Sequence, residues 1–439
     1  MRNTLTLFFL FLAFQISLFS QSTTDAVVAM TAEVNAATPS ITINWELSNE
    51  TANILLFRRE KDSTSWFIML DTVGTNQTTF TDPFVEVGRT YEYGIVREFT
   101  TWTTFTAFGY MSVAVEGEMT ETRGKILVFV EQALQSPLQF ELERFERDLI
   151  GDGWQPTFHF MSETATVDDV KNQIVSDYNA DPDNVKQVFL LGEIPVPYSG
   201  NTNWDAHPDH QGAWVADTYY GDVDGIWTDN TVNNTSPARA ANDNIPGDGK
   251  FDQSVVPSAS ELAVGRVDFS NLDENTFNAT HVELYRRYLD KNHNWRTKKY
   301  TVSNQALIDD NFGYFQGEAF AANGWRNFYP LVGKDNTIEA DFFNDTDDES
   351  YLFGYACGGG SYVSAGGVGN STNFANDSVN IAFSMIFGSY HGDWDSENNP
   401  FMMSALASRG GILSCSWAGR PHWFYQYFAS GETLGYCTV

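Results

Sequence analysis

Two cysteines and one histidine near the C-terminus each stand where an apolar run ends, and their types could perform covalent chemistry. These residues are Cys357, His391 and Cys415. A thiolate attacks an acyl carbon, and an imidazole can take up and return the proton that this attack requires. Open α/β sheets present such groups just beyond the carboxyl ends of their strands. The sequence therefore predicts a cysteine-dependent site at these strand ends.

Glycines and aromatic residues beside these positions could complete the site. The backbone N–H groups of Gly358 and Gly392 are candidate donors to an oxyanion. Aromatic side chains after Cys415 could line a substrate pocket, and they equally fit a cap on the sheet. The candidate substrate-binding residues are Trp417, His422 and Trp423.

Each cysteine also has a purely structural interpretation. A cysteine that closes an apolar strand is usually a small buried hydrophobe, and this interpretation is favoured for Cys415. It is weaker for Cys357, because the following three glycines leave the backbone bare. Cys437 carries no functional signal. The chain shows neither a G-x-S-x-G elbow nor a His/Cys spacing typical of zinc ligands.

A polar insertion between Gly200 and Asp252 carries acids at alternate positions around glycines. Such oxygen ligands could wrap a hard cation, so we expect a calcium site. No complete twelve-residue calcium loop is present, and a solvated, turn-rich loop is the alternative. No motif for an organic cofactor is found. The candidate metal ligands are Asp222, Asp224, Asp229, Asp243, Asp248 and Asp252.

The overall charge bears on the partner class. Acidic residues outnumber basic ones by 57 to 25, which gives a net charge of −32 in 439 residues. Nucleic acids and anionic membrane surfaces need Lys and Arg to neutralise phosphate, so neither is an expected partner. We expect a protein or peptide as substrate or ligand.

The first twenty residues predict export. Arg2 is followed by an almost wholly apolar run from Leu5 to Phe14, and Ser20-Gln21 is a plausible cleavage point. The run is too short to span a bilayer, so we expect no transmembrane segment in the mature chain. The predicted location is secreted or cell-surface. The three late cysteines allow at most one disulfide and leave at least one free thiol.

Two regions must position the candidate site. Residues 25–120 alternate short β-rich runs with turns, which predicts an all-β sandwich. With Trp45 in an early strand and Tyr91 and Tyr93 in a late one, this region resembles a fibronectin type III domain. The predicted strands are 41–45, 54–57, 66–70, 90–96 and 110–115.

From residue 124 to 439, strands alternate with helices, which predicts an α/β domain with a mainly parallel sheet. A capping pattern, Thr166 with Asp169, marks the start of one helix. The predicted strands are 125–130, 188–192, 304–308 and 411–414, with two more ending at Ala356 and Tyr390. The predicted helices are 136–150, 166–177, 272–291, 315–322 and 402–408.

This second region resembles the gingipain-like cysteine peptidases, relatives of the caspases. The matching segments are residues 188–194, the A-D-T-Y-Y-G-D block at 216–222, L-A-V-G-R at 262–266 and the final strands. In that family a His-Gly ends one strand, and a Cys followed by Gly-Asp ends the next. Gly392-Asp393 matches the second landmark. Cys357 therefore stands where the family has its histidine, and His391 stands at or beside the nucleophile position.

Three interpretations of the site remain open. Cys357 and His391 could form an inverted dyad, in which the thiol forms a thioacyl intermediate and the imidazole acts as acid and base. His391 and Cys415 could form a dyad in the family's order. The domain could also be a catalytically inactive surface protein for adhesion or binding. The family often continues into a further β-sandwich and a sorting domain, so the resemblance leaves open a truncation after Val439.

Overall fold

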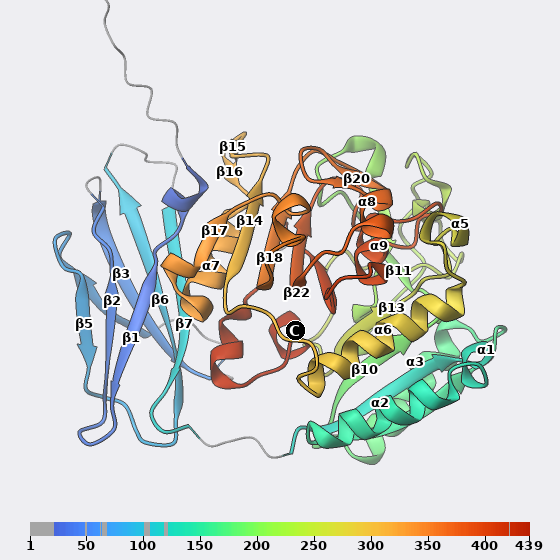
Figure 1. The fold of residues 1–439 in the computed structure, drawn as a ribbon, viewed down its shortest axis with the longest axis horizontal. Helices are drawn as coiled ribbons and strands as arrows, with labels where there is room; N and C mark the ends of the chain where they lie inside the picture. The colour runs from blue at the N-terminus through green and yellow to red at the C-terminus, as the bar shows by residue number, and fades with distance from the viewer. Residues whose placement is uncertain are drawn as a thin grey trace, which may run out of the picture.

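The computed structural model describes residues 22–48, 51–61, 63, 68–100, 106–117, 122–420 and 422–439. The predicted signal segment and the beginning of the strand predicted at 66–70 lie outside these residues. In the part of the chain that is described, no helix is both long and apolar enough to cross a membrane. Figure 1 shows a β-sandwich at one side of a larger α/β body.

The N-terminal region forms two antiparallel sheets, which fit the predicted sandwich. In one of its strands Ile41, Ile43 and Trp45 alternate inward. The Tyr91 hydroxyl accepts the N–H of Glu86 at 2.9 Å, the backbone contact expected of a tyrosine corner. One sheet contains β1 (Met30–Asn35), β2 (Ser40–Trp45) and β5 (Thr79–Asp82), and the other contains β3 (Thr51–Glu60), β4 (Ile68–Val73), β6 (Thr90–Phe99) and β7 (Thr106–Ala114).

The first α/β sheet is wholly parallel, in the order β13-β10-β8-β9. The helix predicted at 166–177 begins as expected, because Thr166 and Asp169 cap each other's backbone N–H groups. The elements are β8 (Gly124–Glu131), α1 (Gln132–Gln135), α2 (Gln139–Gly151), β9 (Trp154–Met161), α3 (Val167–Ala180), β10 (Val185–Leu191) and β13 (Ala263–Val267).

The second sheet is also parallel, in the order β17-β14-β18-β22-β23. Helix α7 lies between this sheet and the sandwich, and α6, α8 and α9 lie on the other side of the sheet (Figure 1). The elements are α6 (His281–Arg296), β14 (Ala306–Asp310), α7 (Ala322–Val332), β17 (Thr337–Glu339), β18 (Tyr351–Cys357), α8 (Ser371–Asn376), β22 (Ile381–Phe387), α9 (Phe401–Ala407) and β23 (Ser414–Trp417).

Short elements surround the carboxyl ends of these strands. The polar insertion contains an antiparallel hairpin and one helical turn, and a small three-stranded sheet follows β18. The elements are β11 (Tyr198–Thr202), β12 (Gly212–Val215), α4 (Thr218–Gly221), β19 (Gly360–Ser361), β20 (Ser364–Ala365) and β21 (Gly369–Asn370).

Two predicted helices are wrong in part. The helix predicted at 272–291 is split into α5 (Glu274–Phe277) and α6, because Asn278 adopts a left-handed φ of +44° that ends α5. The segment 315–322 is a hairpin of β15 (Tyr314–Phe315) and β16 (Glu318–Ala319) rather than a helix. Its two turn residues have φ of +51° and +91°, which a two-residue hairpin favours and a helix cannot contain.

Asn327 of α7 holds the C-terminal segment against the body of the protein. Its side-chain amide donates to the carbonyl of Trp423 at 2.9 Å and accepts the N–H of Tyr425 at 2.6 Å. That segment then reaches the sandwich, where Arg59 donates to the Tyr427 hydroxyl at 2.6 Å. The C-terminal segment, which this buried amide helps to hold, is therefore one of the contacts that join the two regions.

We expect Asn327→Ala to lower the free energy of unfolding by about 2–4 kcal/mol, because it leaves a buried N–H and a buried carbonyl without partners. Urea unfolding followed by circular dichroism measures the loss. The matched control is Asn376→Ala in α8, where the exposed amide contacts a single carbonyl at 2.9 Å. There the change should stay within about 0.5 kcal/mol, and equal losses would contradict the assignment.

Candidate active site

A serine and a histidine meet at the carboxyl end of β22. The strand ends at Phe387, and the chain then turns through Gly388 and Ser389. The Oγ atom of Ser389 lies 2.7 Å from Nε2 of His207, which belongs to the polar insertion. Both residues are half-buried. A hydroxyl hydrogen-bonded to an imidazole is the arrangement that activates a serine nucleophile.

The backbone beside both members of this pair is unusual. Tyr390 follows Ser389 with φ of +66°, and Ala206 precedes His207 with φ of +64°. For residues with a side chain this conformation costs about 1–2 kcal/mol and persists only where contacts enforce it. Tyr390 is held by its N–H, which donates to Asp205 at 3.0 Å, and by its ring, which stacks on His207 at 4.9 Å. Strain of this kind is concentrated at functional sites.

A glycine lets a second loop touch the serine. Gly360 in β19 approaches Ser389 so closely that a Cβ atom would lie 2.2 Å from the Ser389 nitrogen. No other residue type fits there without displacing the backbone. The small sheet after β18 and the turn after β22 thus form one wall of the site.

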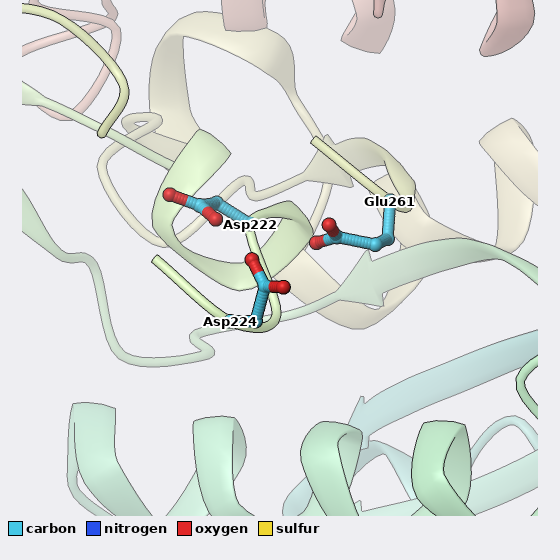
Figure 2. Close-up of side chains that lie close together, drawn as sticks. All are labelled: Asp222, Asp224 and Glu261. Atoms are coloured by element: carbon cyan, nitrogen blue, oxygen red, sulfur yellow. The ribbon is translucent and has the colours of Figure 1, made fainter. Parts of the chain in front are cut away.

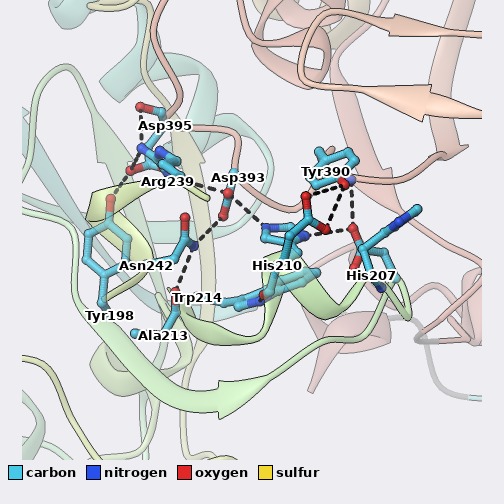
Figure 3. Close-up of polar contacts among 12 residues, drawn as sticks. Tyr198, His207, His210, Ala213, Trp214, Arg239, Asn242, Tyr390, Asp393 and Asp395 are labelled. Carbon is cyan, nitrogen blue, oxygen red and sulfur yellow. Dashed lines mark hydrogen bonds and ion pairs between the residues drawn. The ribbon is translucent and has the colours of Figure 1, made fainter. Parts of the chain in front are cut away.

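A buried histidine of the same insertion, His210, lies close to His207 and bonds to Asp393 (Figure 3). His210 Nδ1 lies 2.7 Å from Asp205, and its Nε2 lies 2.9 Å from Asp393. All three side chains are at most 1% exposed. Burial acts to lower the pKa of His210, but bonds to two carboxylates outweigh it and raise the pKa to about 9. An imidazolium therefore sits between two carboxylates at neutral pH.

Further polar contacts anchor Asp393 and the neighbouring Asp395 (Figure 3). Asn242 donates to Asp393 at 3.1 Å, and Arg239 binds Asp395 through two nitrogens at 2.8 and 2.9 Å. The hydroxyl of Tyr198 also donates to Asp395. The polar insertion is thereby attached to the segment after β22 at several points between Tyr198 and Asn242.

Cys357 and His391 do not form the predicted dyad. The Cys357 thiol, fully buried, donates to Asp310 at 3.3 Å and packs in the core shared with α7. His391 Nε2 lies 3.0 Å from the carbonyl of Ser364, and its ring packs 4.8 Å from Phe401 in the core on the other side of the sheet. The two side chains are therefore bonded to other groups and packed in different cores.

The electrostatics of these residues also disfavour the predicted roles. Burial, with the charge of Asp310, raises the pKa of the Cys357 thiol well above its usual range. Burial lowers the pKa of His391 to about 4, so it is neutral at pH 7. Burial raises the pKa of Cys415 to about 12, and Cys415 pairs in register with Ser384 inside the sheet. None of the three cysteines is in a disulfide.

The predicted oxyanion and substrate residues have other contacts. The N–H of Gly358 donates to the Phe387 carbonyl at 3.1 Å, so it is engaged between strands. Gly392 packs on the ring of Trp214. The remaining three residues lie as follows: Trp417 donates to the Gly388 carbonyl at 3.0 Å beside the serine, Trp423 donates to the Trp417 carbonyl at 2.8 Å, and His422 is exposed.

Two of the six predicted metal ligands come together. Asp222 and Asp224 are joined by Glu261, a residue that was not predicted as a ligand. The three carboxylates place ligand oxygens within 4.8 Å of one another (Figure 2). Such carboxylates are the donors that calcium prefers. Some of their capacity is used: Asp222 accepts the Trp227 indole at 3.0 Å, and Glu261 accepts the Val223 N–H at 2.6 Å. Calcium binding by this trio stays a prediction.

The other four acids fasten the insertion internally. Asp229 accepts two glycine N–H groups at 2.7 Å each, and Asp252 accepts three consecutive backbone N–H groups. Asp248 accepts a backbone N–H at 3.0 Å. The backbone carbonyl of Asp243 accepts from Lys250. These contacts match the alternative of a turn-rich loop.

Sequence reasoning passed over both Ser389 and His207. The apolar run predicts a strand that continues to Tyr390 and contains the serine, whereas β22 ends at Phe387. The available signal was Gly388-Ser389, because a glycine directly after a buried run indicates the strand end. No sequence signal connects His207, 182 residues earlier, to this turn.

No family model and no curated protein matches the sequence. The structure is similar to the Arg-specific cysteine proteinase gingipain R, with a TM-score of 0.41 and 12% identity over 68% of this chain and 63% of that one. It is also similar to the complex of pro- and mature domains of this proteinase from Porphyromonas gingivalis, with a TM-score of 0.43 and 13% identity over 67% and 65%. This chain thus spans less than two thirds of either. The resemblance noted in the sequence is also found in the structure.

Part of the structure is similar to a fibronectin type III domain of the human collagen α-1(XX) chain. The TM-score is 0.18 and the identity is 10%, over 22% of this chain and 86% of that domain.

We expect the three thiols to react slowly with a disulfide reagent in the folded protein. With a pKa near 12 at Cys415, only about one thiol in ten thousand is a thiolate at pH 8, and the thiolate is the reactive form. The Ellman assay at pH 8 should find all three thiols only after denaturation. Rapid reaction of one thiol in the folded protein would contradict this prediction and would support a cysteine nucleophile.

The His210 network predicts a loss of stability at alkaline pH. The folded pKa of about 9 lies above the ordinary 6.5, so the stabilisation is complete below pH 6.5 and is lost as the pH rises to 9. We expect a decrease in unfolding free energy of about 1–3 kcal/mol over this interval. Urea unfolding at several pH values measures it. His210→Gln should flatten the profile, and an unchanged profile would contradict the charged imidazole.

Proposed function

We propose that this protein is a serine-dependent acyl hydrolase, with Ser389 as nucleophile and His207 as its proton acceptor. The observation that carries the proposal is the 2.7 Å contact between Ser389 Oγ and His207 Nε2 at the end of a buried parallel strand. The strained residues beside each partner support it, because such backbone is retained where function requires it.

The chemistry follows from the two side chains. As Ser389 Oγ attacks the substrate carbonyl carbon, its proton passes to Nε2 of His207. The imidazolium returns that proton to the leaving group as the acyl bond breaks, which leaves an ester on Ser389. His207 then takes a proton from water, whose oxygen attacks the ester. The imidazolium returns this proton to Ser389 Oγ as the bond to the acyl carbon breaks, so the acid leaves and the hydroxyl is restored.

Backbone N–H groups could stabilise the oxyanion. The N–H groups of Ser389 and Gly359 donate to no other group within the described part of the chain. Both belong to segments that meet at the end of β22. Donors fixed in the backbone need no rearrangement as charge develops on the oxygen, and each is worth about 3–4 kcal/mol in the transition state.

Peptide or protein substrates are proposed on the basis of the sequence motifs that resemble the gingipain-like peptidases. Action outside the cell or at its surface is proposed on the basis of the signal-like first twenty residues. In this proposal Ser389 is the nucleophile, in place of the cysteine that the resemblance to the gingipain-like peptidases implies.

A non-catalytic binding protein is the second candidate. It is favoured by one observation: within the residues described, no carboxylate is hydrogen-bonded to Nδ1 of His207, and such a carboxylate normally orients a catalytic histidine. In that case the pair would serve only to bind a peptide.

We expect the protein to be labelled by a biotinylated fluorophosphonate, which reacts with activated serines. Ser389→Ala should abolish labelling, and His207→Gln should slow it by about 10²–10⁴-fold through loss of the proton acceptor. Mass spectrometry should find the adduct on the peptide that contains Ser389.

The matched controls are Cys357→Ala and Cys415→Ala, which should label at the wild-type rate. Labelling that persists in Ser389→Ala would overturn the assignment of the nucleophile. A folded wild type that takes up no label would favour the binding protein.

A further inference from the structure

One carboxylate contacts the backbone beside both members of the serine–histidine pair. Asp205 Oδ2 accepts the N–H of Tyr390 at 3.0 Å, and this N–H belongs to the peptide group that follows Ser389. Asp205 Oδ1 accepts the N–H of His207 at 3.3 Å. The two segments come from different parts of the chain, and Asp205 is the described side chain that bonds to both.

These two contacts fall at the strained positions. One bound N–H, that of His207, directly follows Ala206, whose φ is +64°. The other is the N–H of Tyr390 itself, whose φ is +66°. Left-handed backbone is rare for residues with a side chain, so each turn needs an outside contact to keep it. The same carboxylate supplies both contacts.

His210 and Asp393 keep this carboxylate in place. Asp205 is buried, and a buried carboxylate without a partner would take up a proton or move to solvent. Its Oδ2 atom lies 2.7 Å from Nδ1 of His210, which Asp393 binds from the other side at 2.9 Å. Asp393 itself touches neither the serine nor the histidine of the pair through a hydrogen bond of its side chain.

We propose that Asp205 is the positioning residue of the Ser389–His207 pair, fixing both strained turns from one carboxylate. This inference rests on the proposed function. Asp205 is bonded to the backbone on either side of the reacting atoms rather than to the His207 ring, so it sets the distance and direction between Oγ and Nε2. Small errors of position at reacting atoms reduce rates strongly.

The test uses Asp205→Asn in the full chain. An amide nitrogen donates and does not accept, so the N–H of either His207 or Tyr390 loses its acceptor when it replaces a carboxylate oxygen. The probe is the biotinylated fluorophosphonate: Oγ attacks phosphorus, fluoride leaves, and His207 takes the proton. We expect the maximal labelling rate, kinact, to fall on the order of 10–100-fold. The half-saturation constant, KI, should stay within about twofold, because substrate contacts are untouched.

Asp229→Asn is the matched control, since this carboxylate of the polar insertion also accepts two backbone N–H groups, those of Gly247 and Gly249 at 2.7 Å each, but contacts neither the pair nor His210. Its kinact should stay within about threefold of wild type even if the thermal midpoint falls as far as in Asp205→Asn. A merely structural role would instead give both variants the same kinact.

Two further variants keep the proposal testable if Asp205→Asn folds poorly. Asp205→Glu retains the charge beside His210 but displaces the oxygens, and its kinact should fall about tenfold. Ala206→Gly, which accepts left-handed backbone readily, should restore part of the kinact lost in Asp205→Asn. Wild-type kinact in Asp205→Asn or in Asp205→Glu overturns the positioning role. A wild type that takes up no label overturns the proposed function itself.

Discussion

The buried imidazolium of His210 between Asp205 and Asp393 is the interaction on which the candidate site depends. Three ionisable groups at most 1% exposed are tolerated because their charges alternate and their hydrogen bonds are satisfied. Asp205 and Asp393 are far apart in the sequence: Asp205 belongs to the polar insertion, and Asp393 belongs to the turn after β22. Their common partner joins these segments into one unit, and each carboxylate accepts a further donor: the backbone N–H of Tyr390 at Asp205 and the side-chain amide of Asn242 at Asp393.

That unit also explains why the long insertion is ordered although it has little regular structure. Its acids accept backbone N–H groups within the loop, and its far end is held by the pairing of Arg239 with Asp395. The second sheet supplies a stable floor, since β18 and β22 are buried on both faces. The sandwich lies on the opposite side of α7 from this sheet and contacts the C-terminal segment.

The sequence predicted the architecture well where the physical signal is local. Alternating strands and helices indicated a mainly parallel sheet, and the structure contains two such sheets rather than one. The helix cap predicted at Thr166 was found at that residue. The hairpin at 314–319 was missed because two left-handed residues, one of them Gln316, override an apparent helical pattern.

For the candidate site, the sequence identified the region but not the residues. Cys357 and His391 end neighbouring apolar runs, yet their side chains pack in different cores. Side chains alternate between the two faces of a strand, so a one-residue error in where the strand ends changes the face on which a side chain is expected. An apolar run alone does not define that end. His207 depends on how the insertion folds back, which is a tertiary event.

The state of the three cysteines has a consequence for the conditions under which this fold can form. Cys357 and Cys437 are buried, all three thiols are unpaired, and burial raises the pKa of each. No disulfide contributes to stability, and the raised pKa of each thiol disfavours the thiolate that oxidation requires. The same native structure is therefore compatible with reducing and oxidising surroundings. A chain made in one compartment and used in another would need neither a disulfide-forming enzyme nor protection of its thiols.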